Sequence, residues 1–179
     1  MRYKYYNKSN KSEVIAQVDT HDKVIGKVSR QKAHDRGILH REVGVWFLNK
    51  KGKILVQIRL DNRHFDNSAG GHFPYYESYR QAAIREVSEE LGIEIRPGQL
   101  NKVCKDFVET KRIKYPHIRY LTIFRVQGNY ETSQFRPNKD EVYSLEFHHP
   151  SNLLAMIEKE PGKFTNGFAT LLQKVYGKS

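Results

Sequence analysis

The chain has 179 residues, with 31 Lys and Arg against 20 Asp and Glu, and a formal net charge of +11. This length fits one domain with a single core, for which 38% hydrophobic and 12% aromatic residues supply the side chains. No stretch approaches the roughly 20 apolar residues of a membrane span. The start of the sequence has no apolar run, so we expect no signal peptide. Cys104 is the only cysteine, which excludes an internal disulfide, and we expect a cytoplasmic protein.

The basic excess bears on the class of ligand. A positive surface attracts anionic ligands and can also hold nucleic acid without sequence preference. The lysines and arginines are scattered, and neither an aromatic RNA-binding strand motif nor a zinc-finger spacing is present. The charge therefore favours steering of a phosphorylated small molecule, with nucleic-acid binding as an open alternative.

The first third of the chain predicts strands. Residues 1–12 are polar and without periodicity, so we expect a flexible N-terminal arm. Polar and apolar residues alternate as in a β-strand over 13–19 and again over 23–29, with a turn between the two segments. This pattern predicts an N-terminal β-hairpin. A polar connector with room for one turn of helix follows at 30–37. Two further strands are expected on either side of a short loop, at 39–48 and 53–60.

A helix is predicted between Ser78 and Gly92. Ser78 and Gln81 form a capping box at its start, and Gly92 stands where a left-handed C-cap ends a helix. At about 100° per residue one side carries an apolar stripe. The residues of this stripe are Ile84, Val87 and Leu91.

Three carboxylates, Glu86, Glu89 and Glu90, project from roughly the opposite side of this helix within one turn of one another. Like charges at this spacing cost about 0.2–0.5 kcal/mol per pair, and carboxylates in a last turn oppose the helix dipole. A solvated acidic face is one interpretation. The glycine-led loop before the helix and the neighbouring Arg85 favour another, in which Mg²⁺ bound to oxygen ligands holds a polyphosphate and removes the repulsion.

The last part of the chain predicts three more strands and two helices. A basic loop at 111–116 and a turn-rich segment at 127–139 separate the strands. Helical spacing then predicts packed C-terminal helices. The strands are expected at 103–110, 117–126 and 143–149, and the helices at 152–160 and 168–178.

The stretch GHFPYYESYRQAAIREVSEELGI, residues 71–93, resembles the Nudix box at every fixed position. These positions are Gly71, Glu77, Arg85, Glu86, Val87, Glu89, Glu90, Gly92 and Ile93. The resemblance implies an α/β fold, the Nudix α/β/α sandwich around a mixed sheet, with residues 13–179 as a single domain. Tyr76 stands where many members have glycine, so the path of the loop is left open.

The resemblance also implies residue roles. Glu86, Glu89 and Glu90 would ligate Mg²⁺ (Mn²⁺ is possible), and the carbonyl of Gly71 can add a ligand. Glu77 and Arg85 would orient the loop and the helix. Glu86 or Glu90 is the expected general base, and Glu141, from a region that often supplies one in this family, is a contender; a surface carboxylate is the alternative for Glu141. The implied activity is hydrolysis of a diphosphate linkage in a nucleoside diphosphate-type or related small molecule.

Residues 18–59 resemble one branch of the family, the isopentenyl-diphosphate-isomerase-like proteins, in the run HREVGVWFLNKKGKILVQIR and the segments before it. The isomerases use a cysteine just before the box glycine, and here that residue is Gly70. Cys104 is expected to be an inert, buried thiol on a strand. Hydrolysis is therefore favoured over isomerisation. A protein that binds without turnover and an RNA 5′-end pyrophosphohydrolase stay open as further alternatives.

Four more residues have predicted positions or roles. Arg59 and Arg63 precede the box and are candidates to bind the diphosphate through their donor forks, although a solvated arginine beside Asp61 is an equal alternative. His72 matches a histidine that binds metal in the isomerases, and we expect a hydrogen-bonded structural role for it. Trp46 is expected in the core. Neither the specific substrate nor the oligomeric state follows from the sequence.

Overall fold

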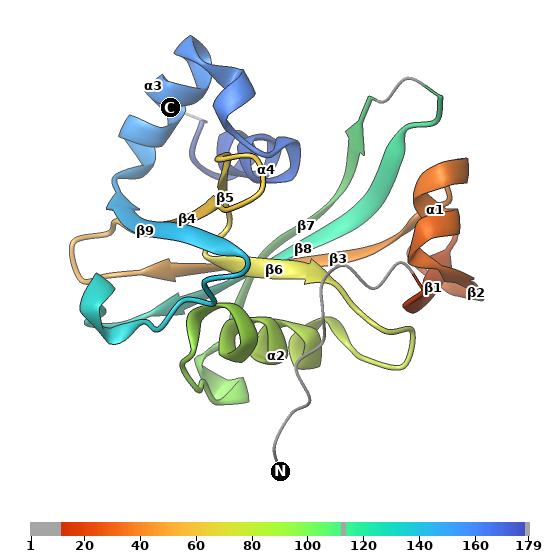
Figure 1. The fold of residues 1–179 in the computed structure, drawn as a ribbon, viewed down its shortest axis with the longest axis horizontal. Helices are drawn as coiled ribbons and strands as arrows, with labels where there is room; N and C mark the ends of the chain where they lie inside the picture. Colours follow the sequence, from red (N-terminus) through yellow and green to blue (C-terminus); the bar gives the residue numbers. More distant parts are fainter. Residues whose placement is uncertain (1–11, 112–113, 178–179) are drawn as a thin grey trace.

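The computed structural model describes residues 12–111 and 114–177. A seven-stranded mixed sheet lies between helix α2 (Tyr79–Leu91) on one face and helices α3 (Pro150–Lys159) and α4 (Asn166–Tyr176) on the other (Figure 1). The predicted α/β/α sandwich is confirmed, together with its C-terminal helices. The expected flexible arm at 1–12 lies, apart from Ser12, outside the described residues. That 13–179 form a single domain stays a prediction.

The strands form a sheet with the order β5-β4-β3-β8-β7, in which β6 also pairs with β3 and β9 with β4. Among the described strands of this sheet, β3 and β8 are the one pair that runs parallel, and the other pairs are antiparallel. The strands are β3 (His40–Leu48), β4 (Ile54–Arg59), β5 (Phe65–Asp66), β6 (Ala69–His72), β7 (Asn101–Thr110), β8 (His117–Gln127) and β9 (Val142–His148). Short 3₁₀ turns lie at Pro97–Gln99, Thr132–Gln134 and Pro161–Lys163.

The N-terminal hairpin, strands β1 (Val14–Val18) and β2 (Val24–Ser29), forms a separate two-stranded sheet. Helix α1 (Arg30–Arg36) follows it, and both lie at one end of the main sheet (Figure 1). The connector for which the sequence predicted one turn of helix is thus a capped helix. Ser29 accepts from the Lys32 amide, and Gly37 ends the helix at φ +61°. A small cluster of Ile15, Val28 and Ala33 joins hairpin and helix.

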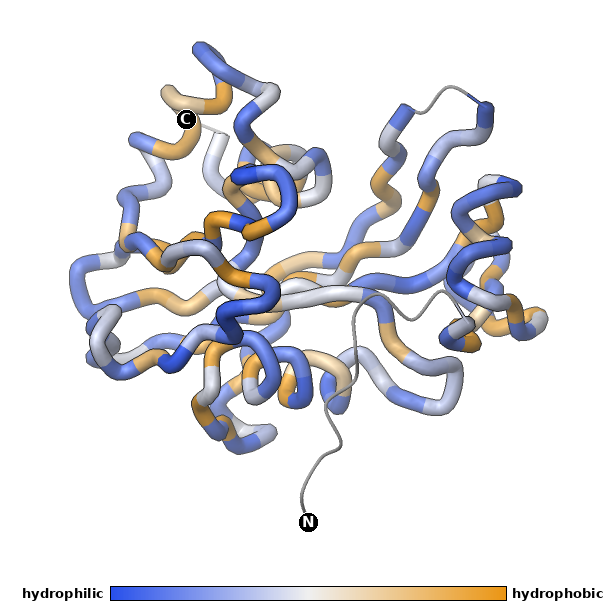
Figure 2. Tube along the Cα trace, viewed as in Figure 1, coloured by the Kyte–Doolittle hydropathy of each residue, from blue (hydrophilic) through white to orange (hydrophobic). Residues whose placement is uncertain are grey.

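Two hydrophobic clusters fill the faces of the sheet. On one face, residues of α2 pack on alternate residues of β3 such as Val45 and Phe47. On the other, α3 and α4 pack around Trp46, which is fully buried as predicted. Figure 2 shows polar and apolar segments alternating along these two helices, as expected where one side faces a core. No helix in the described part of the chain is long and apolar enough to cross a bilayer.

The predicted ends of α2 are confirmed. The Ser78 hydroxyl accepts from the Gln81 amide while the Gln81 side chain accepts from the Ser78 amide. Gly92 has φ +65°, and its amide donates to the Ser88 carbonyl. The core stripe is wider than predicted, because Ala82 and Ala83 are also buried in it.

Replacing Gly92 tests how this end is built. A Cβ atom there would lie 2.5 Å from the Arg136 carbonyl oxygen, in a backbone conformation that side chains rarely adopt. We expect Gly92→Ala to lower the free energy of unfolding by about 1–3 kcal/mol in urea denaturation. Gly98→Ala is the control, since a Cβ atom there meets nothing within 4 Å. Equal losses in both variants would contradict the prediction.

Candidate functional site

Arg85 lies at the centre of the predicted site. Its side chain is 9% exposed. Its Nε atom donates to both carboxylate oxygens of Glu77, each at 3.1 Å. Its Nη1 atom donates to Glu86 at 3.0 Å and to Glu89 at 2.9 Å. One guanidinium group therefore joins the loop glutamate to two glutamates of the helix.

The three helix glutamates, Glu86, Glu89 and Glu90, are called the box carboxylates below. Glu86 and Glu90 are 3% and 1% exposed, and the Glu89 side chain is 13% exposed. Gln57 of β4 donates to Glu90 Oε2 at 3.3 Å. A solvated acidic face, the alternative interpretation of the sequence, is therefore wrong: α2 presents these carboxylates toward other parts of the protein.

Several carboxylates lie close together around the Nudix box. Burial raises the pKa of Glu89, and repulsion from Glu86 and Glu141 adds to the rise, although Arg85 opposes it. Burial likewise raises the pKa of Glu13, at the start of the hairpin, where Glu86 and Glu77 also repel it. Sequence analysis did not identify Glu13. Nothing in its spacing could have done so, because only the fold brings the hairpin beside the box.

Glu141, in the segment before β9, lies near the box carboxylates. The Asn138 amide donates to the carbonyl of Glu90 at 2.9 Å, and the Asn138 side chain donates to Glu141 Oε1 at 3.2 Å. Glu141 acts electrostatically on Glu89, as its contribution to the raised pKa shows. The structure thus brings together the predicted carboxylates from two distant segments.

The two arginines predicted to bind the diphosphate have other partners. Arg59 donates through Nε and Nη2 to the two oxygens of Asp61, at 3.0 and 2.9 Å, and through Nη1 to Asp66 at 3.4 Å. The Arg63 guanidinium lies 3.5 Å from the centre of the Tyr143 ring. For Arg59 this is the predicted alternative, an arginine paired with Asp61.

The donor set suits a hard divalent cation. Carboxylate oxygens are the ligands that Mg²⁺ prefers. Glu89 Oε1 is buried and has no hydrogen-bond partner among the described residues, an arrangement that costs free energy unless a cation occupies the position. Gly71 lies in β6, opposite Val43 of β3, at the start of the loop that leads to Glu77.

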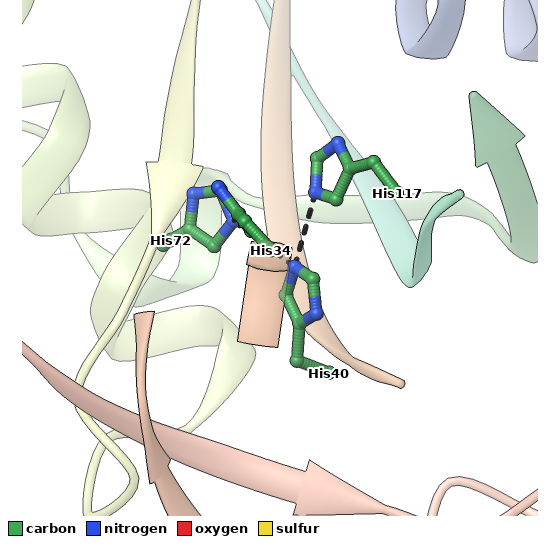
Figure 3. Close-up of side chains that lie close together, drawn as sticks. All are labelled: His34, His40, His72 and His117. Atoms are coloured by element: carbon green, nitrogen blue, oxygen red, sulfur yellow. Dashed lines mark hydrogen bonds between the residues drawn. The ribbon is translucent and has the colours of Figure 1, made fainter. Parts of the chain in front are cut away.

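A second group of side chains lies at the end of the sheet near α1. His34, His40, His72 and His117, called the histidine cluster below, come from α1, β3, β6 and β8, with ligand nitrogen atoms within 4.8 Å of one another (Figure 3). The expectation of a hydrogen-bonded structural role for His72 missed this convergence. The parallel pairing of β3 and β8, which places the starts of both strands together, was not predicted.

Gly70 and Cys104 bear on the choice of reaction. A Cβ atom on Gly70, where φ is +153°, would lie 2.3 Å from the Val43 carbonyl oxygen. The position occupied by cysteine in the isomerases therefore requires glycine in this backbone. Cys104 packs with the cluster under α4, on the sheet face opposite α2, and burial raises the pKa of its thiol. It is half-buried rather than buried as predicted, and its inert role stays a prediction.

Comparison with known proteins finds both isomerases and Nudix hydrolases among the relatives. The model of the NUDIX domain matches residues 38–168. An isopentenyl-diphosphate Delta-isomerase of Serratia proteamaculans is 28% identical over 90% of each chain. An uncharacterized Nudix hydrolase of Streptomyces coelicolor is 37% identical over 47% of this chain and 49% of that one. A crystal structure from Deinococcus radiodurans shares the fold, with a TM-score of 0.72, 22% identity and coverage of 92% and 99%.

The family match covers the box, the sheet strands on both sides of it and the segment that carries Glu141. It confirms the sequence-based prediction of a Nudix-type enzyme. The chain therefore belongs to the NUDIX domain family.

Proposed function

We propose that the protein is a Mg²⁺-dependent hydrolase that cleaves a diphosphate linkage in a nucleoside diphosphate-type or related small molecule. The observation that supports this most is the group of box carboxylates, of which Glu86 and Glu89 accept from Arg85 and Glu90 accepts from Gln57. A net charge of +11 favours the approach of such an anionic substrate. A cytoplasmic location, expected from the single cysteine, stays a prediction.

The box carboxylates would hold the ion, with the Gly71 carbonyl as a further candidate ligand. When bound there, Mg²⁺ supplies Lewis-acid polarisation of phosphate oxygens and lowers the pKa of a coordinated water; Mn²⁺ accepts the same oxygen ligands. Arg85 and Glu77 keep the loop and the helix in register through the contacts described above. They are positioning residues for the carboxylates.

A carboxylate must also accept the proton of the attacking water. Glu86 and Glu90 are the candidates on the helix, and Glu141 is the candidate from the segment before β9. General-base assistance contributes typically 10²–10⁴-fold to a rate. The leaving phosphate carries the charge that develops, and its stabilisation depends on the ion and on nearby donors.

Arg59 and Arg63 stay predictions as substrate contacts. Because Arg59 is paired with Asp61 and Asp66, a diphosphate would have to compete with two carboxylates for its donors. For Arg63 the competitor would be the Tyr143 ring on which its guanidinium is stacked.

Isomerisation is the second candidate, because relatives aligned over about 90% of this chain are isopentenyl-diphosphate isomerases. The backbone at Gly70 opposes it, since no side chain fits there without movement of β3.

We expect Glu86→Gln and Glu90→Gln each to lower kcat at least a hundredfold on a nucleoside diphosphate in the presence of Mg²⁺. Product formation from a panel of nucleotides, dinucleotides, nucleotide sugars and prenyl diphosphates, separated by liquid chromatography, provides the measurement. Glu94→Gln, an exposed carboxylate just beyond the helix, is the control and should keep normal turnover. Near-normal rates in both box variants would overturn the proposed site.

We also expect the wild-type protein to leave the double bond of isopentenyl diphosphate in place, as followed by NMR. Gly70→Cys should not create isomerase activity and should lower the melting temperature, because its Cβ atom meets the Val43 carbonyl. Gly26→Cys is the matched control, since the nearest atom to a Cβ there is a flexible side chain at 3.4 Å. Isomerisation by the wild type would instead establish the second candidate.

A further inference from the structure

An exposed aromatic ring lies at the start of β9, with an arginine stacked on it. The Arg63 guanidinium lies 3.5 Å from the centre of the Tyr143 ring. Tyr143 is nevertheless 61% exposed, which leaves much of the ring open to solvent. It belongs to neither of the two hydrophobic clusters on the faces of the described sheet. The pair therefore contributes little to the core, and its contact calls for another explanation.

A β-bulge sets the direction of Tyr143. Ile58 of β4 lies opposite Ser144 of β9. The next pair is Arg59 with Val142, so Tyr143 is an extra residue that has no partner in the ladder of β4. Bulges re-aim a side chain and are over-represented beside active sites. Here the bulge leaves Val142 buried and Tyr143 exposed.

The loop between β4 and β5 holds Arg63 in an uncommon backbone conformation. Arg63 has φ +61°, in the left-handed region that side chains other than those of Asn and Asp rarely adopt. The Asn62 side chain shapes the turn by accepting from the His64 amide at 2.9 Å, and the Arg63 amide donates to the Arg59 carbonyl at 3.2 Å. Strained backbone of this kind clusters at ligand-binding positions. Two local irregularities, one in each segment, thus bring the guanidinium onto the ring.

Both segments lie at the edge of the proposed site. The Leu60 amide donates to the Glu141 carbonyl at 2.8 Å, which joins the loop of Arg63 to the segment before β9. Glu141, near the box carboxylates, stands two residues before Tyr143. The stacked pair is therefore held beside a carboxylate that the proposed reaction uses.

The register of the sheet gives the separation of the ring from the box carboxylates. Gln57, which donates to Glu90, lies opposite Leu145 of β9. Tyr143 stands two residues from Leu145 along the same strand, which is about 7 Å at the rise of a β-strand. A ribose can span such a separation between a diphosphate at the box carboxylates and an aromatic group at Tyr143.

Tyr143 and Arg63 offer the kind of surface on which a nucleobase stacks. Aromatic side chains and guanidinium planes both stack on bases. A guanidinium on one side of the ring also orders the ring in advance, so that less rotamer freedom is lost on binding. Its positive charge favours an anionic nucleotide over a neutral aromatic compound.

We propose that Tyr143, held by Arg63, is the stacking platform for the base of the substrate, so that this site selects nucleoside diphosphates over diphosphates without a base. The inference rests on the proposed function, because it places the diphosphate at the box carboxylates. It gives Arg63 a role different from the predicted one, since the guanidinium holds the ring and not the diphosphate. Because every base has a π-face, the platform selects for a base without choosing among bases.

The first test measures binding without turnover. α,β-Methylene-ADP, whose P–C–P bridge resists hydrolysis, is titrated into the full chain with Mg²⁺ and compared with methylenediphosphonate, which has no base. The wild type should bind the nucleotide analogue more tightly by calorimetry. In NMR spectra the adenine protons should shift upfield on binding, because they enter the ring current of a stacked tyrosine.

Three variants locate the stacking ring. Tyr143→Ala should abolish the upfield shift and weaken binding of α,β-methylene-ADP by about fivefold or more, whereas Tyr143→Phe should keep both. Tyr115→Ala is the matched control and should bind as the wild type does. Tyr115 is also an exposed tyrosine beside a cation, Lys114, but it lies in the loop between β7 and β8.

The second test follows hydrolysis of ADP with Mg²⁺. Tyr143→Ala should raise KM by about fivefold or more, and Tyr143→Phe should restore the wild-type KM. A general loss of folding would lower kcat as well and would not be repaired by a ring without the hydroxyl group alone.

Equal binding of α,β-methylene-ADP and methylenediphosphonate by the wild type, or no upfield shift, would overturn the platform. So would unchanged binding of the analogue in Tyr143→Ala, with folding confirmed by circular dichroism. The proposed function fails separately, if the wild type hydrolyses no diphosphate; the upfield shift then still decides the platform. Hydrolysis of ADP with a KM that Tyr143→Ala leaves unchanged would overturn the platform alone.

Discussion

The structure around the box depends on the contacts of one buried guanidinium group. Arg85 holds Glu77 of the loop and Glu86 and Glu89 of the helix within hydrogen-bond distance. Without a positive charge among them, buried carboxylates this close would repel one another strongly. Arginine suits the position because its planar fork donates in several directions and keeps its charge when buried. The contacts of Arg85 therefore both fix the geometry of the loop and allow the carboxylates to lie close together.

The features that the sequence predicted correctly depend on residues close together in the chain. The capping box, the Gly92 cap and the three glutamates lie within one helix, where a fixed rise and rotation per residue convert spacing into geometry. The alternation of residues likewise predicted most strands. The connector at 30–37 was underestimated because its caps, Ser29 and Gly37, are polar or small residues that are equally common in loops.

What depends on non-local pairing was not predicted. Glu13 meets the box only because the hairpin folds against the loop, where the Tyr75 amide donates to the Val14 carbonyl. His117 meets His40 only because β8 runs parallel to β3 with His40 beside Arg119. Strand register has no counterpart in the spacing of a single sequence, since any of several pairings buries the same apolar residues.

The two groups of side chains differ in the chemistry of their donors, and this difference keeps them distinct. The box offers carboxylate oxygens with an arginine among them, and oxygen is the ligand atom that a hard divalent ion prefers. The histidine cluster offers ring nitrogens that lie within 4.8 Å of one another. β6 and its following loop join the two places, because His72 and Gly71 are adjacent and Glu77 follows in the same segment. Because β6 pairs with β3, and β3 pairs with β8, the same strand pairings position the histidine cluster and the start of the loop that carries Glu77.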